Sequence, residues 1–377
     1  MKIVHIFRDC KFFDSVSDFF DSIDGIENLY PFYCRNLNYQ FKYIHNVDKV
    51  KKVNHYNDYI SYLNADDTDV IYFHGIHFSQ YKLFKYIGAR QKVIWWCWGT
   101  EIYDYGICNH RVINMELYKS YTRKHMLTHP STKDCLIKIY QILFGWYNWK
   151  LKKKVINRVD YFSPVLPIEY DMMIKECPYF RAKPFMDKRG PGSVNVPPLS
   201  YKRITGNIMI GHSLSYSTNI LDLLEIVKGI NIASSRDIYI PISYGNAYGG
   251  KEKFMKHHTY KKNFKWLPDF LPYSDYCKIY GSITHAIFGV LRQQGLGNIS
   301  LCIRMGCKMF FYKDSIVYKH LKSSGYVVFS IEDDLNEKSL IEPLTKEDAL
   351  HNYELHVESN NKTFISVRED LNKIENT

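Results

Sequence analysis

Short apolar segments that end in glycine constrain most strongly how this chain can fold. Two of them, 69–75 (DVIYFHG) and 92–99 (KVIWWCWG), lie in the first half and are separated by stretches of helical character. Uninterrupted apolar strands of this kind are typical of parallel sheets that helices cover on both faces. Residues 2–7 and 161–165 have a similar composition. We therefore expect a parallel α/β domain in the first half.

A stretch rich in proline and glycine, residues 181–206, interrupts the pattern and is typical of a connection between domains. The alternation then resumes, with strands expected at 207–213, 237–245, 263–271, 284–290, 308–312 and 326–331. Helices are expected at 220–227, 272–283, 294–305 and 316–322. Two βα domains in series are thus predicted, with boundaries at 1–185, a linker at 186–205, 206–350, and a C-terminal helix, 351–377, that packs back on the first domain.

Composition excludes several classes of protein. With 46% hydrophobic and 16% aromatic residues, the 377-residue chain has enough apolar surface to build a core. The nine cysteines are scattered and form no CxxC pair, so we expect reduced thiols in a cytosolic protein and neither a disulfide framework nor a zinc site. The most apolar uncharged runs, 139–149 and 280–291, have 11 and 12 residues, whereas a transmembrane helix needs about 20. The N-terminus is typical of a first strand and not of a signal peptide.

Most of the positive charge is concentrated in one segment. The net charge is +11, and residues 119–154 contribute +8 of it. Apolar side chains recur there at helical spacing, at Leu136, Tyr140, Leu143 and Tyr147. Such a helix can lie on an anionic membrane, or it can dock on a core with a solvated basic face. The first reading gives as membrane contacts Trp146, Trp149, Lys150, Lys152, Lys153 and Lys154. Nucleic acid also binds basic patches, but no RNP, zinc-finger or helix-turn-helix signature is present.

Polar and small residues follow several expected strands, at the edge where parallel sheets bind their ligands. The segment 292–298 (RQQGLGN) leads from an apolar strand into a helix. Glycines there let backbone N–H groups approach a phosphate, the helix dipole favours an anion, and Arg292 can add a bidentate contact. The alternative is a loop that uses glycine only for turn geometry. The segment matches neither the P-loop nor the dinucleotide-binding pattern.

A second polar turn, 211–213 (GHS), opens the second domain. It can bind a diphosphate or a sugar, and its serines can equally cap the helix that follows. Tyr244 and Gly245 form a lesser turn. The second domain therefore gives these candidate binding residues: Gly211, His212, Ser213, Ser217, Tyr244, Gly245, Arg292, Gln293, Gln294, Gly295, Gly297 and Asn298.

In the first domain the corresponding turns are 74–77 (HGIH) and 99–101 (GTE). Glu101 follows three tryptophans, and removal from water makes a carboxylate more basic, so it is a candidate general base. It can also simply begin a helix, with no catalytic task.

No metal ion is expected. His74 and His77 lack the HExxH spacing and have no third ligand nearby. The single Asp-x-Asp pair, Asp67 and Asp69, precedes its strand and so lies at the wrong end of the sheet for a metal-bound diphosphate. Helix termini and Arg292 would then neutralise a diphosphate.

Seven motifs occur in the order that is found in a known family, namely 73–75 (FHG), 96–103 (WCWGTEIY), 211–219 (GHSLSYSTN), 244–245 (YG), 271–280 (LPYSDYCKIY), 292–298 (RQQGLGN) and 328–337 (VFSIEDDLNE). Through them the chain, from about residue 70 to 340, resembles the bacterial TDP-4-acetamido-4,6-dideoxygalactose (Fuc4NAc):lipid II transferases of enterobacterial common antigen synthesis. RQQGLGN and WGTEIY are the most specific of these motifs. The sequence departs from the family at Glu101, where Asp is common, at His212, where Asn is usual, and at Ile220, where His is common.

The resemblance implies a GT-B glycosyltransferase, with two Rossmann-like domains facing across a cleft and a nucleotide-sugar held mainly by the second. The acceptor would be an oligosaccharide on a polyprenyl diphosphate at the cytoplasmic face of the bacterial inner membrane, where the protein would be peripheral. Glu101 would be the base, Arg292 would stabilise the leaving diphosphate, and no cofactor is implied. The acceptor side would comprise His74, Gly75, His77, Trp98, Gly99 and Thr100. The alternative is a non-catalytic membrane-surface or glycan-binding protein on a degenerate GT-B fold.

Overall fold

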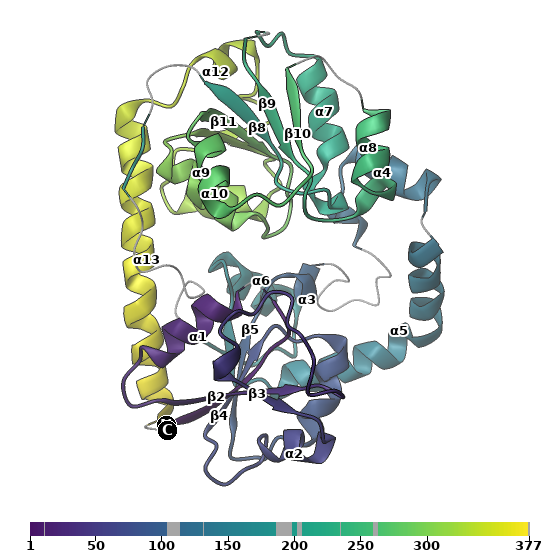
Figure 1. The fold of residues 1–377 in the computed structure, drawn as a ribbon, viewed down its shortest axis with the longest axis vertical. Helices are drawn as coiled ribbons and strands as arrows, with labels where there is room; N and C mark the ends of the chain where they lie inside the picture. Colours follow the sequence, from purple (N-terminus) through teal and green to yellow (C-terminus); the bar gives the residue numbers. More distant parts are fainter. Residues whose placement is uncertain are drawn as a thin grey trace. The chain divides into compact units, whose positions relative to one another are not determined.

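The computed structural model of the protein describes residues 1–10, 12–103, 114–130, 132–185, 198–201, 206–233, 235–258 and 263–375. The chain divides into two compact units, and each is assembled from separate segments (Figure 1). The first unit comprises Met1–Ile113, Tyr140–Val194 and Asn361–Thr377. The second comprises Asn114–Ile139 and Asn195–Asn360.

The first unit is built on a seven-stranded parallel sheet with the strand order β3-β2-β1-β4-β5-β6-β7. Its strands are β1 (Lys2–Ile6), β2 (Glu27–Tyr33), β3 (Val50–Val53), β4 (Val70–His74), β5 (Lys92–Trp96), β6 (Tyr161–Ser163) and β7 (Lys183–Pro184). All five residues of β4 are buried, which explains its uninterrupted apolar sequence. The sequence did not predict β2, which contains Pro31, or β3, whose short VKKV segment has two lysines.

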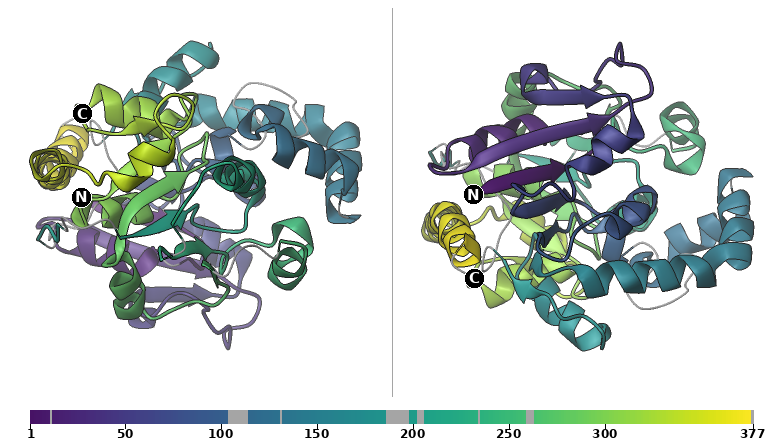
Figure 2. Two further views of the ribbon diagram at one scale, coloured as in Figure 1. Left: turned by 90° about the horizontal axis from the view of Figure 1, so that it is seen from above. Right: turned by 90° about the horizontal axis from the view of Figure 1, so that it is seen from below.

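Helices of the first unit are α1 (Phe13–Asp21), α2 (Tyr56–Ser61), α3 (Thr100–Tyr103) and α6 (Ile168–Glu176), with a 3-10 helix, η2 (Phe78–Lys85). The long helix α5 (Thr132–Arg158) contributes its C-terminal part. The last turns of α13 (Lys346–Glu375) place Val367, Leu371 and Ile374 in the same core cluster as Ile3 and Tyr72. Both chain ends therefore lie in this unit, and the Met1 amino group is 3.4 Å from the Glu375 carboxylate (Figure 2).

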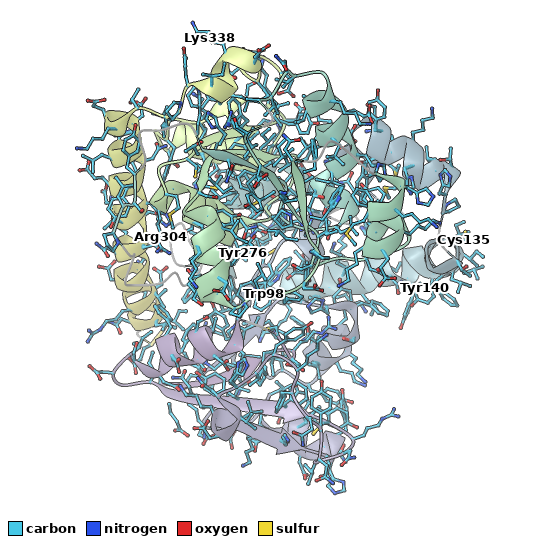
Figure 3. All side chains as sticks on the ribbon, turned by 45° about the horizontal axis from the view of Figure 1, so that its top comes forward. Trp98, Cys135, Tyr140, Tyr276, Arg304 and Lys338 are labelled. Carbon is cyan, nitrogen blue, oxygen red and sulfur yellow. The ribbon has the colours of Figure 1, made fainter. Side chains whose placement is uncertain are left out.

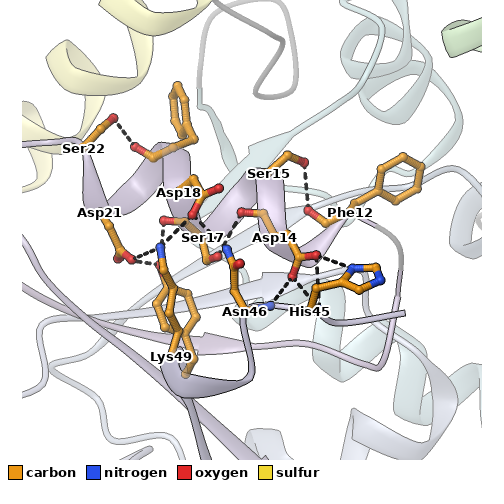
Figure 4. Close-up of polar contacts among 12 residues, drawn as sticks. Phe12, Asp14, Ser15, Ser17, Asp18, Asp21, Ser22, His45, Asn46 and Lys49 are labelled. Atoms are coloured by element: carbon orange, nitrogen blue, oxygen red, sulfur yellow. Dashed lines mark hydrogen bonds and ion pairs between the residues drawn. The ribbon is translucent and has the colours of Figure 1, made fainter. Parts of the chain in front are cut away.

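Acidic residues on α1 hold the loop that leads into β3 (Figure 4). The Asp14 carboxylate accepts backbone N–H groups of His45 and Asn46, each at 3.0 Å. Lys49 forms ion pairs with Asp18 and Asp21 at 2.8 and 2.7 Å. These contacts fix the edge of the sheet, although exposed ion pairs of this kind contribute little stability.

The second unit is built on a six-stranded parallel sheet with the order β10-β9-β8-β11-β12-β13. Its strands are β8 (Asn207–Ile210), β9 (Ile238–Pro241), β10 (Phe264–Leu267), β11 (Ile283–Phe288), β12 (Lys308–Phe311) and β13 (Phe329–Ser330). Helices include α4 (Ser120–Thr128), α7 (Ile220–Lys228), α8 (Lys251–His257), α9 (Tyr273–Tyr280), α10 (Leu296–Arg304), α11 (Ile316–Ser323) and α12 (Glu337–Ile341). The predicted class, α/β with two Rossmann-like sheets, is confirmed.

Some predicted boundaries in the second unit were wrong. The helix expected at 272–283 ends at Tyr280, because Gly281 follows it and Ile283 already begins β11. The strand expected at 326–331 is reduced to Phe329–Ser330.

The predicted first domain also departs from the structure, because residues 114–139 cluster with the second unit. The reason is a buried carboxylate on α7. Asp222 accepts the backbone N–H groups of Tyr121 and Thr122 at 2.8 and 2.9 Å, and so holds the first turn of α4. Most of the linker predicted at 186–205 lies outside the described residues.

Candidate functional site

Both sheets have one point where the strand order reverses, and open α/β sheets bind ligands beyond the carboxyl ends of the strands at such points. In the first unit this point lies between β1 and β4, and in the second unit between β8 and β11. The turns 211–213 and 292–298, which the sequence singled out, follow β8 and β11. They therefore flank the reversal of the second sheet.

The turns after β8 and β11 touch each other. Gly211 and Gly295 have φ values of +67° and +73°, a region that favours glycine. A Cβ atom at Gly295 would lie 3.0 Å from Nδ1 of His212, so the imidazole packs directly on this glycine. Nearby, the Ser217 hydroxyl donates a hydrogen bond of 2.7 Å to the side-chain oxygen of Gln294.

The turn after β9 joins the same group of loops. The Leu214 N–H donates to the Tyr244 carbonyl at 2.6 Å. Gly245 has φ +88°, and a Cβ atom there would lie 2.6 Å from the Leu214 carbonyl group. The structure thus brings together the predicted residues of three turns at one edge of one sheet.

This edge of the second sheet remains partly open to solvent. Arg292, Gln293, Gln294, Gly295 and Asn298 are half-buried, and Gly297 is exposed. A Cβ atom at Gly297 would meet no described atom within 4 Å. An Arg side chain, glycine backbone and the start of α10 thus lie together at this edge, and such groups can bind an anion.

Ser213 differs from the expectation. Its side chain is buried, and its hydroxyl donates to Ser215 Oγ at 3.3 Å. The residue that precedes α7 is Asn219, so the expected serine cap of this helix is not what the structure shows.

In the first unit, Glu101 holds two turns together. Its Oε1 atom accepts the backbone N–H groups of Ile76 and Trp98, both at 3.2 Å, and the Trp95 indole N–H at 3.5 Å. Oε2 accepts the Thr100 hydroxyl at 3.2 Å. Glu101 is buried and lies in the first turn of α3. The Glu101 carboxylate therefore has a structural role, because it links the turns after β4 and β5.

Glycine is required on both sides of this carboxylate. Gly75 and Gly99 have φ values of +77° and +95°, and a Cβ atom at Gly75 would lie 3.1 Å from Glu101 Oε1. The sequence correctly predicted both glycines as turn residues. At Gly75 the structure also gives a packing reason, because the Glu101 carboxylate occupies the space that a side chain would need.

His74 is a core residue, contrary to the prediction of an acceptor contact. Its Nε2 atom is 2.9 Å from Nδ1 of buried His5, whose Nε2 atom is 3.0 Å from the Asn28 side-chain oxygen. Burial lowers the pKa of both imidazoles, that of His5 to about 4, so the pair is neutral at pH 7. The sequence placed His74 at a strand end but gave no sign of its partner on β1.

Among the first-unit candidates, Thr100 is exposed, and His77 and Trp98 are half-buried. Burial, with Arg8 nearby, lowers the pKa of His77 to about 4. Trp98, which is labelled in Figure 3, has two aromatic neighbours. It meets the rings of Trp96 and the exposed Phe12 edge-on, at centroid distances of 5.3 and 5.2 Å. An aromatic surface therefore accompanies the polar turn.

Glu169 is a buried acid that the sequence did not suggest. It accepts the Tyr103 hydroxyl at 2.9 Å and the Leu166 N–H at 2.8 Å. Burial raises the pKa of Glu169 to about 7. Through Tyr103, this acid is bonded to the short helix α3, which also carries Glu101.

The helix α5, which carries much of the basic segment 119–154, has an exposed apolar part and a C-terminal part that packs into the first unit. Among the described side chains of α5, seven large apolar ones are exposed, with Ile142 at 74% and Leu143 at 68%. They are Leu136, Ile139, Tyr140, Ile142, Leu143, Phe144 and Tyr147. Figure 3 labels Tyr140 and the exposed Cys135 on this helix. Towards its C-terminus the helix instead packs into the first unit through the buried Val155 and Ile156.

Two of the predicted membrane lysines are engaged within the first unit. Lys152 donates a hydrogen bond of 2.7 Å to the Glu101 carbonyl oxygen. Lys153 lies over the rings of Tyr179 and Trp149, at 5.1 and 5.7 Å. Lys150 and Lys154 are exposed, Trp149 is half-buried, and the side chain of Trp146 lies outside the described part.

The described residues contain no group of three or more metal-ligating side chains. Asp67 and Asp69 bind the Lys2 ammonium group and the Lys2 backbone N–H, at the amino end of β1. Eight cysteines are free in the described part of the chain. Within the same residues, no helix is long and apolar enough to cross a bilayer.

No protein-family model and no curated protein matches the sequence. Solved structures do resemble the whole chain. The lipopolysaccharide outer core galactosyltransferase WaaB superposes with a TM-score of 0.54 at 10% identity, covering 100% of this chain and 99% of that one. The chain has the GT-B fold. Sucrose-phosphate synthase from Thermosynechococcus elongatus gives a TM-score of 0.57 at 7% identity, with 99% and 94% covered, and OtsA gives 0.54 at 10%, with 100% and 97% covered.

Proposed function

We propose that the protein is a glycosyltransferase that moves a sugar from a nucleoside diphosphate to a lipid-linked oligosaccharide in bacterial surface-glycan synthesis. The observation that carries this proposal is the meeting of three glycine turns at the strand-order reversal of the second sheet. A partly exposed Arg292 lies in one of these turns. In a GT-B fold, this is a suitable place for a nucleotide-sugar.

The donor diphosphate would be held by the Arg292 guanidinium and by backbone N–H groups near Gly211, Gly295 and Gly297. Negative charge grows on the diphosphate as the bond to the sugar breaks, so fixed donors there stabilise the transition state more than the ground state. The proposed reaction uses no metal and no cofactor besides the donor. On the resemblance of the motifs, we propose a deoxy-amino sugar similar to fucose as the donor sugar.

Glu101 is the proposed base of the first unit. Its Oε2 atom, which accepts the Thr100 hydroxyl, would take the proton of the acceptor hydroxyl as that oxygen attacks the sugar carbon. Gly75, His77, Trp98 and the aromatic surface beside them would bind the acceptor glycan, since aromatic rings offer an apolar face with a polar edge.

The exposed apolar side chains of α5 support a location at a membrane surface. Leu143 and Ile142 lie in a segment that carries most of the net charge, and apolar contact combined with lysine favours an anionic bilayer. We propose that the protein is peripheral, at the cytoplasmic face of the inner membrane. There a polyprenyl-linked acceptor would also be found.

Thermal unfolding with TDP-, UDP- and GDP-sugars tests the donor assignment, because a ligand that binds the folded state raises its melting temperature. We expect one class of nucleotide-sugar to raise it, and the matching sugar to appear on a lipid-linked acceptor. Binding with neither transfer nor donor hydrolysis would instead support the non-catalytic alternative. No shift with any donor would contradict the proposed function.

A vesicle assay tests the membrane assignment. The double variant Ile142→Ser, Leu143→Ser should lose binding to vesicles that contain anionic lipid while transfer to a soluble acceptor is retained. Phe270→Ser is the matched control, because Phe270 has a similar exposure of 70% outside α5. Equal vesicle binding by both variants would contradict the assignment. Binding of the wild type to duplex DNA instead would favour a nucleic-acid partner.

A further inference from the structure

Residues 115–123, here called the strap, run along the carboxyl edge of the second sheet. The Lys119 ammonium group lies 3.2 Å from the Asp314 carboxylate, just after β12, and 3.9 Å from Glu332, just after β13. The Thr122 hydroxyl lies 3.3 Å from the hydroxyl of Tyr248, in the connection that follows β9. The strap thus contacts the loops after three strands.

Asn219 connects the strap to the loop after β11. Its side-chain amide donates to the Gly289 carbonyl at 2.7 Å and to the Leu117 carbonyl at 3.1 Å. Its side-chain oxygen accepts the Lys119 N–H at 2.7 Å. Gly289 is the residue between β11 and the segment that leads to 292–298. One side chain therefore holds the strap and the base of the proposed donor loop together.

The backbone of Asn219 is also unusual. It has φ +51° and ψ +38°, in the left-handed region, and it is fully buried. Among residues with a side chain, Asn and Asp adopt this conformation with least strain. Gly289 completes the contact, since a Cβ atom there would lie 2.4 Å from the Thr218 carbonyl oxygen. Position 219 thus needs a left-handed backbone, an amide donor and an acceptor at once.

We propose that Asn219 is a positioning residue for the donor loop 289–298, which it fixes to the strap. The inference rests on the proposed function, because that function makes this loop the donor site. Buried hydrogen bonds to Gly289 and Leu117 hold the loop in one conformation before the ligand arrives. A loop that is already ordered loses less entropy on binding, so the positioning appears as donor affinity.

Asn219→Gly tests this assignment, because glycine keeps the left-handed backbone but removes the three hydrogen bonds of the side chain. Asn219→Asp keeps an acceptor for the Lys119 N–H but has no amide to donate to Gly289. Asn352→Ala is the matched control. Asn352 is a buried Asn of the same unit that bonds the Val327 N–H at 2.8 Å and the Val327 carbonyl at 3.0 Å, before β13 begins.

Two measurements are made on the full-length protein. The first is the dissociation constant of TDP, UDP and GDP. For the nucleotide that binds the wild type, we expect both Asn219 variants to raise the dissociation constant by about tenfold. In turnover this should appear as a raised KM for the donor with a smaller change in kcat. The second is amide hydrogen exchange, which should speed up across 289–298 in the Asn219 variants and not in Asn352→Ala.

The outcomes separate this inference from the proposed function. If the wild type binds none of the three nucleotides, the proposed function fails, and hydrogen exchange still decides whether Asn219 orders the loop. If the wild type binds one of them and Asn219→Gly binds it equally well, with unchanged exchange across the loop, the positioning role is refuted. Equal effects in the Asn219 variants and in Asn352→Ala would also refute it, because they would reflect a general loss of stability.

Discussion

The carboxyl edges of the two sheets are built from similar turns but use their polar groups differently. In the first unit, the Glu101 carboxylate and the His74 imidazole are buried and bonded within the protein. In the second unit, Arg292 and the start of α10 remain partly exposed beside glycines. The same βα design can therefore bury the polar groups of a turn to hold its own loops, or leave them more open to a ligand. Glu101 holds loops in addition to its proposed role as the base.

Arg292→Ala should have the largest effect on chemistry. If the second edge holds the donor diphosphate, loss of the guanidinium should lower kcat by a factor of about 10² to 10³. Stability should change by less than about 0.5 kcal/mol, because the side chain is partly exposed. The measurement is steady-state transfer kinetics beside chemical denaturation. Arg304→Ala, at the other end of α10, is the control, and equal kinetics for the two variants would remove Arg292 from the mechanism.

Glu169→Gln should change how stability depends on pH. The pKa of Glu169 is raised from 4.5 to about 7, so the unfolded chain releases this proton at lower pH than the folded protein does. The contribution of Glu169 to stability is therefore complete below pH 4.5 and is lost as pH rises towards 7, by about 3 kcal/mol. Glutamine can still accept the Leu166 N–H, and it stays neutral.

Denaturation of wild type and Glu169→Gln from pH 4 to 8 checks this expectation. The difference between the two curves should grow in favour of the variant as pH rises. His5 and His74 have the opposite effect: because their pKa values are lowered, they reduce the unfolding free energy of the protein as pH falls below 6.5. This effect is the same in both proteins, so it cancels in the difference. A constant difference across the range would show that Glu169 does not titrate as the structure indicates.

Glu101→Gln should sharpen the contrast between the edges, because it should affect folding as well as turnover. The amide oxygen cannot replace both carboxylate oxygens for the Ile76, Trp98 and Thr100 donors, so we expect a loss of about 2 kcal/mol of unfolding free energy. Urea denaturation and kcat are measured on the same preparation. Lost activity with wild-type stability would make Glu101 a base without a structural role, and wild-type values of both would exclude either role.

Gly297→Ala should have the smallest effect on nucleotide binding, and it should raise stability instead of lowering it. The position is exposed, helical and uncrowded, so alanine should stabilise the protein by up to about 1 kcal/mol. Nucleotide affinity should nevertheless fall severalfold if a phosphate approaches this backbone. Gly295→Ala is the comparison, because φ +73° and the His212 ring at 3.0 Å predict a loss of stability there. Unchanged nucleotide affinity in Gly297→Ala would show that the phosphate does not bind against the Gly297 backbone.

Much of the fold could be predicted because its central strands are buried on both faces. The apolar runs around β4 and β11 follow directly from that burial. Turns 211–213 and 292–298 were found for a related reason, since glycine and polar residues mark where a buried strand ends. Strands β2 and β3 were missed because Pro31 and the two lysines of VKKV interrupt the apolar pattern. Both strands are partly exposed, and β3 is the edge strand of the sheet.

The contacts between distant segments could not be predicted in this way. Nothing in the residues around Asn219 or Asp222 indicates that their partners lie about 100 positions earlier, near Lys119 and Thr122. For the same reason, His74 was assigned to the acceptor side, although it is buried against His5. Periodicity describes which side of an element is buried, but a partner is specified only by the packed structure.

The strap restricts where the gene of this protein can recombine with that of a homologue. The second unit is discontinuous in the gene, because it needs residues 114–139 as well as 195–360. A single crossover near residue 200 would join the strap of one parent to the Asn219 and Asp222 of another. Recombination should therefore yield a folded protein when residues 114–139 and 195–360 come from the same parent. We expect the two segments to be inherited as a pair among homologues.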